Sequence, residues 1–139
     1  MLKFTAGKMD EDRNYDIYNE DGSIIAYVSE SPYYSDSSLM LSVNDPTEKG
    51  KSLQLVRVKT KKIAIEELVQ YVEKLKVTLQ NEKSTAQSLE TAITMLSADT
   101  LSYPKAILEK ELLSVEKKIA KLKEKLTAIL PESEAQQFV

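Results

Sequence analysis

Apolar residues recur at alternating steps of three and four through the second half of this 139-residue chain. The first series begins at Ile65 and ends at Leu96, and only Glu82 interrupts it. The second series begins at Leu108 and ends at Ile129, and every position in it is apolar. Because this spacing keeps one stripe of a helix turned toward a partner, the pattern predicts two coiled-coil helices, at about residues 61–97 and 103–130.

A break separates the two series. Residues 97–103 do not continue the spacing, and Pro104 suits the first turn of a new helix because its missing N–H is not needed there. Pro131 stands where the second helix should stop. A connection this short makes the two helices antiparallel neighbours, so the sequence predicts a helical hairpin.

The first sixty residues have a different composition, with all three glycines and five of the seven tyrosines. Asp21 and Gly22 separate two β-prone runs, which is a strong signal for a β-hairpin. Further strands are expected at residues 39–43 and 52–59, with a short edge strand at residues 3–6.

The predicted fold class is therefore α+β, with a small antiparallel meander of four or five strands followed by the coiled-coil hairpin. A sheet this small needs a covering element on one face. The expected segments are a β-module over residues 1–59, the hairpin over 60–131 and a tail over 132–139, which either docks on the bundle or stays free.

The flanks of the two apolar stripes differ. The flank positions of the second helix are charged: Glu109, Glu111, Glu116, Lys118, Lys123 and Lys125. One flank of the first helix is small or partly apolar: Ala64, Tyr71, Thr78, Thr85 and Ala92. This wider stripe predicts a further covering element, which is either the sheet of the same chain or a second copy.

We favour the second copy, which gives a homodimer in which two hairpins form a four-helix bundle. The residues expected to mediate this assembly are Val72, Leu75, Leu79, Leu89, Ile93, Leu112, Val115, Ile119 and Leu122.

The chain contains no Cys and no His. Disulfides, thiol catalysis, histidine general bases and the usual zinc sites are thereby excluded. The three glycines lie far apart, which argues against a phosphate-binding loop. We therefore expect a protein that is not an enzyme and carries no cofactor. The sequence shows neither a signal peptide nor a long apolar run, so we expect a cytoplasmic protein that makes no membrane contact.

Two charged segments suggest binding sites. Asp10, Asp12, Asn14, Asp16 and Asp21 have the spacing of a calcium loop, but Tyr15 occupies the position that requires glycine. An acidic surface loop is the simpler interpretation. The second segment, residues 49–62, is basic and has no acid: Lys49, Lys51, Arg57, Lys59, Lys61 and Lys62.

Arg57, Lys59 and Lys61 of this basic segment are expected to project from one strand face, as single-stranded nucleic acid would require. The alternative is that these cations protect a sheet edge from pairing with other chains. The net charge of −3 and the six acids within residues 10–21 argue against nucleic acid.

The favoured function is protein–protein interaction. Tyr33 and Tyr34, on an expected loop, are candidate contacts because tyrosine is enriched at interfaces. Asp99, at the expected tip of the hairpin, is a third candidate. Small acidic proteins of this kind are often inhibitors or adaptors, including bacteriophage proteins that block host defence or replication proteins. The sequence does not identify the partner.

Overall fold

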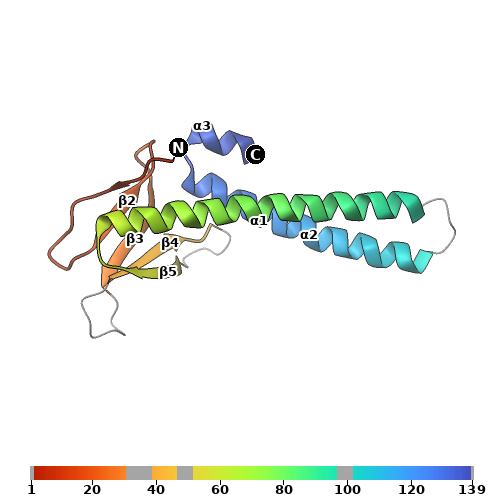
Figure 1. Ribbon diagram of the computed structural model, residues 1–139, viewed down its shortest axis with the longest axis horizontal. Helices are drawn as coiled ribbons and strands as arrows, with labels where there is room; N and C mark the ends of the chain where they lie inside the picture. Colours follow the sequence, from red (N-terminus) through yellow and green to blue (C-terminus); the bar gives the residue numbers. More distant parts are fainter. Residues whose placement is uncertain (1, 31–38, 47–51, 97–101, 139) are drawn as a thin grey trace.

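The structure is a computed structural model that describes residues 2–30, 39–46, 52–96 and 102–138. Five antiparallel strands form one sheet in chain order, and four helical segments follow. The strands are β1 (Thr5–Ala6), β2 (Tyr15–Tyr18), β3 (Ile24–Glu30), β4 (Leu39–Asn44) and β5 (Ser52–Val58). The helical segments are α1 (Lys61–Leu96), α2 (Ser102–Ile129), α3 (Glu132–Ala135) and the 3-10 turn η1 (Gln136–Phe138). The predicted α+β class, the antiparallel meander and the helical hairpin are confirmed (Figure 1).

The turn between β2 and β3 forms where Asp21 and Gly22 predicted it. Gly22 has a φ of +81°, a conformation that glycine adopts without steric cost. Its N–H donates to the carbonyl of Asn19, and the N–H of Asn19 donates to the carbonyl of Ser23, each at 3.0 Å. The turn sets a register in which Ile17 lies opposite Ala26, so both side chains point to the same face.

One face of the sheet packs against the helices. Ile17, Val28 and Leu41 lie on this face and have no solvent exposure. The first half of α1 crosses the same face (Figure 1) and contributes Leu68 and Val72, which are also fully buried. The sheet and the hairpin therefore share one hydrophobic core.

The end of α2 completes this core. Leu126, Ile129 and Leu130 belong to the same buried cluster as the strands. Residues 132–138, which we expected either to dock or to stay free, form α3 and η1. Ala135 is buried in the core and Phe138 packs half-buried against it. The segment is therefore docked.

The second half of the hairpin projects beyond the sheet (Figure 1). At 1.5 Å per residue, α1 is about 54 Å long, so the sheet covers only part of it. Ala86 is the one buried residue of α1 beyond Leu79. Leu89 and Ile93 continue the predicted stripe but remain half-buried.

The β2–β3 turn is fastened to the end of α2 by side chains. The buried amide of Asn19 donates to the carbonyl of Ile129 at 3.2 Å, and its Oδ1 accepts the N–H groups of Asp21 and Ser23. The carboxylate of Asp21 accepts the N–H of Glu132 at 2.6 Å. The carbonyl of Ile129 and the N–H of Glu132 lie at helix ends, where backbone groups have no partner inside the helix, and the turn supplies those partners.

We predict that Asn19→Ala lowers the free energy of unfolding by about 1–3 kcal/mol, because the buried carbonyl of Ile129 loses its donor and the N–H groups of Asp21 and Ser23 lose their acceptor. The measurement is urea unfolding followed by circular dichroism. The control is Glu20→Ala, an exposed neighbour in the same turn, which should change stability by less than about 0.5 kcal/mol. Equal effects of the two variants would contradict the role assigned to Asn19.

Candidate functional site

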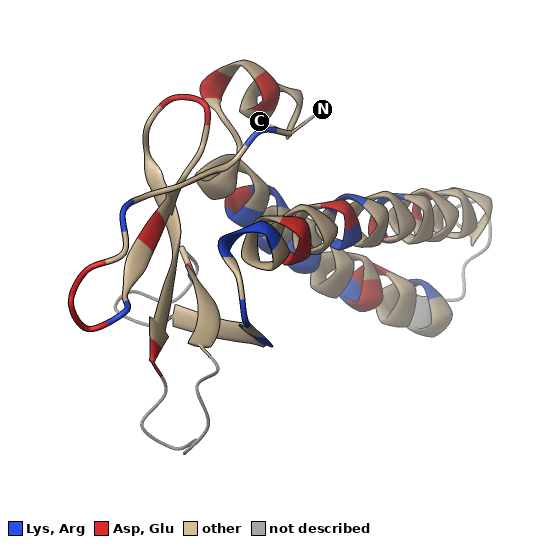
Figure 2. Ribbon diagram, turned by 60° about the vertical axis from the view of Figure 1, so that its left-hand side comes forward, with Lys and Arg blue, Asp and Glu red and all other residues tan. Residues whose placement is uncertain are grey.

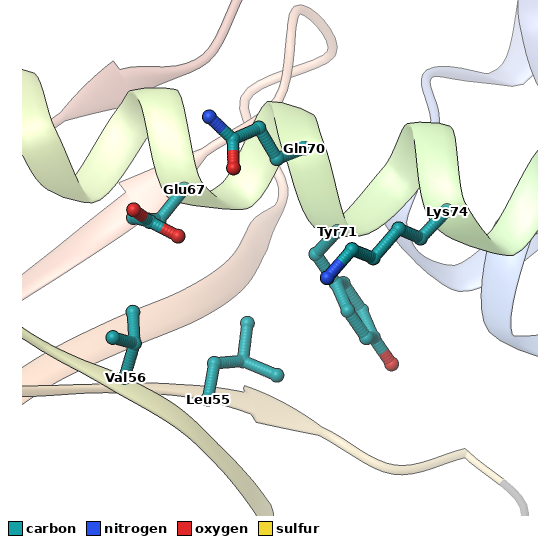
Figure 3. A pocket seen from close by; sticks show the side chains of 6 residues that line it. All are labelled: Leu55, Val56, Glu67, Gln70, Tyr71 and Lys74. Atoms are coloured by element: carbon teal, nitrogen blue, oxygen red, sulfur yellow. The ribbon is translucent and has the colours of Figure 1, made fainter.

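A groove runs between β5 and α1 (Figure 3). Its cavity volume is about 140 Å³. Leu55 and Val56 form the wall on the sheet side. The wall on the helix side comes from α1: Glu67, Gln70, Tyr71 and Lys74. We call this feature the β5–α1 groove.

An irregularity in β5 explains why two successive side chains face the groove. Val56 pairs with Leu41, but the next residue of β4, Ser42, pairs with Gln54. Leu55 is thus an extra residue with no counterpart in β4, as in a β-bulge. A regular strand would turn Leu55 and Val56 to opposite faces, whereas both are directed toward α1 in Figure 3.

Tyr71 supplies a large half-buried ring at one end of the β5–α1 groove (Figure 3). Burial raises the pKa of its hydroxyl above the usual 10.0, and the negative charge of Asp45 raises the pKa further. Asp45 follows β4 in the chain, so the tyrosine hydroxyl lies near a carboxylate from the sheet. This end of the groove combines an apolar ring with a polar rim.

Arg57, Lys59 and Lys61, which we expected on one strand face, do not share one, because β5 ends at Val58 and α1 begins at Lys61. Arg57, Lys59 and Lys62 are exposed. Lys61 instead folds back onto β1 and β2: its Nζ donates to the carbonyl of Gly7 at 2.8 Å and lies 5.4 Å from the centre of the Tyr15 ring. Lys61 therefore has a structural contact that its position in a basic run did not indicate.

Several predicted residues fall outside the described part of the chain. These are Tyr33, Tyr34, Lys49, Lys51 and Asp99.

The loop that resembles a calcium site is organised by hydrogen bonds between the side chain of Asp10 and the backbone of the same loop. Oδ1 of Asp10 accepts the N–H groups of Asp12 and Asn14, at 2.9 and 2.8 Å. Arg13 takes the left-handed conformation with a φ of 65°. Among the described residues, no group of three or more acids lies close enough to hold a metal ion.

The residues predicted to mediate dimerisation separate into two groups. Val72, Leu75, Leu79 and Val115 are buried within the single chain. The others are half-buried: Leu89, Ile93, Leu112, Ile119 and Leu122. The chain therefore covers part of the apolar stripe by itself.

A second hollow, of about 350 Å³, opens between the projecting halves of α1 and α2. We call it the hairpin hollow. Its lining residues are Glu82, Thr85 and Leu89 of α1 and Glu111, Ser114, Val115 and Lys118 of α2. Thr85 belongs to the flank of small residues on α1. This flank widens the apolar stripe of the helix beyond what one partner helix covers.

Our sequence interpretation missed the β5–α1 groove. The one available signal was Tyr71, a large side chain on the otherwise small flank of the first helix. The extra residue Leu55 gave no signal, because a bulge depends on how the neighbouring strand pairs.

No family model, curated protein or solved structure matches this chain. Within the described residues, no helix has the length and apolar character needed to cross a membrane.

The raised pKa of Tyr71 predicts a pH dependence of stability. The folded chain holds the phenolic proton more tightly than the unfolded chain, so this stabilisation is complete below about pH 10 and is lost as the pH rises through the folded-state pKa. We expect the free energy of unfolding of the wild type to fall more steeply above about pH 10 than that of Tyr71→Phe. The measurement is urea unfolding at a series of pH values.

Asp45→Asn provides a second variant for this prediction. Removing the nearby negative charge lowers the pKa of Tyr71, so the slope should lie between those of the wild type and Tyr71→Phe. Parallel curves for all three proteins would show that Tyr71 ionises equally easily in the folded and unfolded chains.

Proposed function

We infer that this chain is a non-enzymatic protein-interaction module that assembles as a homodimer through the projecting half of its hairpin. The observation that carries the proposal is that one flank of α1 is covered near the sheet and largely uncovered along the projecting hairpin. The first members of this flank, Ala64 and Tyr71, pack against the sheet, and the flank continues along α1 through Thr78, Thr85 and Ala92. Thr78 and Thr85 are exposed, and Ala92 is half-buried.

The hairpin hollow lies beside this uncovered flank. Leu89 and Val115 are apolar residues in its lining, and Thr85 and Ser114 are small enough to let another helix approach closely. Toward the end of the hairpin, the side chains of Met95 and Ile107 are 74% and 47% exposed. Exposed apolar groups on a narrow two-helix projection favour a further covering element.

Charge supports a second copy as that element. Glu111 and Lys118 line the hairpin hollow, seven residues apart on the same face of α2. In a dimer whose two-fold axis crosses the hairpin near Ser114, Glu111 of one chain faces Lys118 of the other. The flank of α1 at Thr78, Thr85 and Ala92 carries no charge that would oppose close approach.

The proposed mechanism is steric. The paired hairpins form a rigid support, and each chain presents its sheet module to a partner protein. An inhibitor or adaptor, encoded by a bacteriophage or another mobile element, fits this mechanism because it requires binding and no chemistry. The absence of Cys and His from the chain agrees with such a role.

Light scattering tests the assembly. We predict a mass near twice 15.7 kDa for the wild type at concentrations of about 100 μM. The double variant Thr85→Glu and Ala92→Glu should weaken the dimer by more than about tenfold, because it places carboxylates in a contact that excludes water.

The matched control is the double variant Gln87→Glu and Thr91→Glu, which adds the same charge to exposed positions of the same helix outside the small flank. It should leave the mass unchanged. A single-chain mass for the wild type, or an equal effect of both double variants, would rule out the proposed dimer.

Nucleic-acid binding is the second candidate function. It is favoured by the exposure of Arg57, Lys59 and Lys62 near the junction of β5 and α1, where blue segments gather in Figure 2. The red segments of the loops flanking β2 carry the opposite charge in the same module. This opposing charge is why protein interaction remains the first proposal.

A gel shift with a single-stranded oligonucleotide at low salt decides on this candidate. If the candidate is correct, the wild type shifts the oligonucleotide and the triple variant Arg57→Glu, Lys59→Glu and Lys62→Glu does not. The triple variant Lys110→Glu, Lys117→Glu and Lys121→Glu makes the same change in net charge at exposed positions of α2 and should retain the shift. No shift by the wild type at low salt would eliminate nucleic-acid binding.

A further inference from the structure

The last strand of the sheet has an unpaired edge. Within the described residues, β5 pairs with β4 on one side and with no strand on the other. It is seven residues long, and Arg57 is its one charged residue. The side chain of Leu53 is 40% exposed. An edge that is long, exposed and nearly uncharged offers its backbone N–H and C=O groups to another strand.

The β5–α1 groove lies on the helix-facing side of this edge (Figure 3). A strand paired with β5 would run about 4.8 Å from it. Its inward side chains would then meet Leu55, Val56 and Tyr71. The cavity of about 140 Å³ is close to the size of one known to hold benzene in another protein, so it suits an aliphatic side chain such as leucine.

Charge at the groove indicates what should flank that aliphatic side chain. Glu67 lies near Val56, at the end of the groove away from Lys74 (Figure 3). Its side chain is half-buried, and among the described residues no Lys or Arg forms an ion pair with it. Side chains two residues apart on a strand share a face and are about 6.6 Å apart. A basic residue two positions from the aliphatic one can therefore approach Glu67.

We propose that the outer edge of β5 binds an extended segment of a partner protein as a sixth strand. An aliphatic side chain of this segment enters the β5–α1 groove, and a Lys or Arg two residues away pairs with Glu67. Main-chain hydrogen bonds supply affinity and the groove supplies selectivity, as in other cases of β-strand addition. This inference rests on the proposed function as a protein-interaction module and specifies the chemistry of its partner.

The test begins with selection of random octapeptides on the full-length chain. We expect enriched sequences to contain an aliphatic residue with Lys or Arg two positions away. Binding of an enriched peptide is then measured by fluorescence polarisation. Glu67→Lys should weaken binding by about tenfold or more, because it replaces attraction with repulsion.

Two controls accompany this measurement. Glu73→Lys makes the same charge change at an exposed position of α1 outside the groove and should change affinity by less than about twofold. Two versions of the peptide are methylated on alternate backbone nitrogens, so that each version loses the N–H donors on one side of the strand. The version that loses the donors facing β5 should not bind. Circular dichroism of both protein variants should match that of the wild type.

The inference would be overturned by any of these peptide results: no enriched peptide, binding that withstands methylation on either side of the peptide, or equal effects of Glu67→Lys and Glu73→Lys. A loss of the dimer in Glu67→Lys would assign the edge to a second copy and also overturn it. Peptides that bind without depending on Glu67 would leave the protein-interaction function standing. The dimer is tested separately, because Thr85→Glu with Ala92→Glu should keep peptide affinity.

Discussion

Burial of one face of the sheet against α1 is the contact on which the other features depend. A single sheet leaves its apolar face open to water, so Ile17, Val28 and Leu41 need the cover that Leu68 and Val72 provide. Because α1 is much longer than the sheet is wide, the same helix then continues beyond it with only α2 as a neighbour. The β5–α1 groove lies where α1 does not fully cover the sheet. The hairpin hollow lies where α1 has only α2 beside it.

Much of the fold could be predicted because its main signals are local. The steps of three and four marked both helices, and Asp21 with Gly22 marked the turn between β2 and β3. What could not be predicted depends on residues far apart in sequence. Lys61 contacts Gly7, and Asn19 contacts Ile129, although neither pair leaves a pattern in the chain. The groove was missed for the same reason, since it requires both the bulge at Leu55 and the position of α1.

The two surfaces are held at a fixed separation by one continuous helix. Tyr71 and Thr85 are fourteen residues apart in α1, which corresponds to about 21 Å along the helix axis. If both proposed contacts form, a strand in the β5–α1 groove and a second hairpin on the flank of α1 therefore occupy separate stretches of the same helix. If the hairpins pair, the dimer presents two grooves, and a partner with two extended segments gains affinity from their linkage.

The contact between Asn19 and Ile129 has a consequence for synthesis of the chain on the ribosome. The two residues are 110 positions apart, so the strands and α1 emerge well before the end of α2 is available. Until then the sheet lacks Leu126, Ile129 and Leu130, and part of its apolar face is open to water. The nascent chain thus passes through a stage in which exposed strands can associate with other chains, and chaperone binding at that stage would protect it.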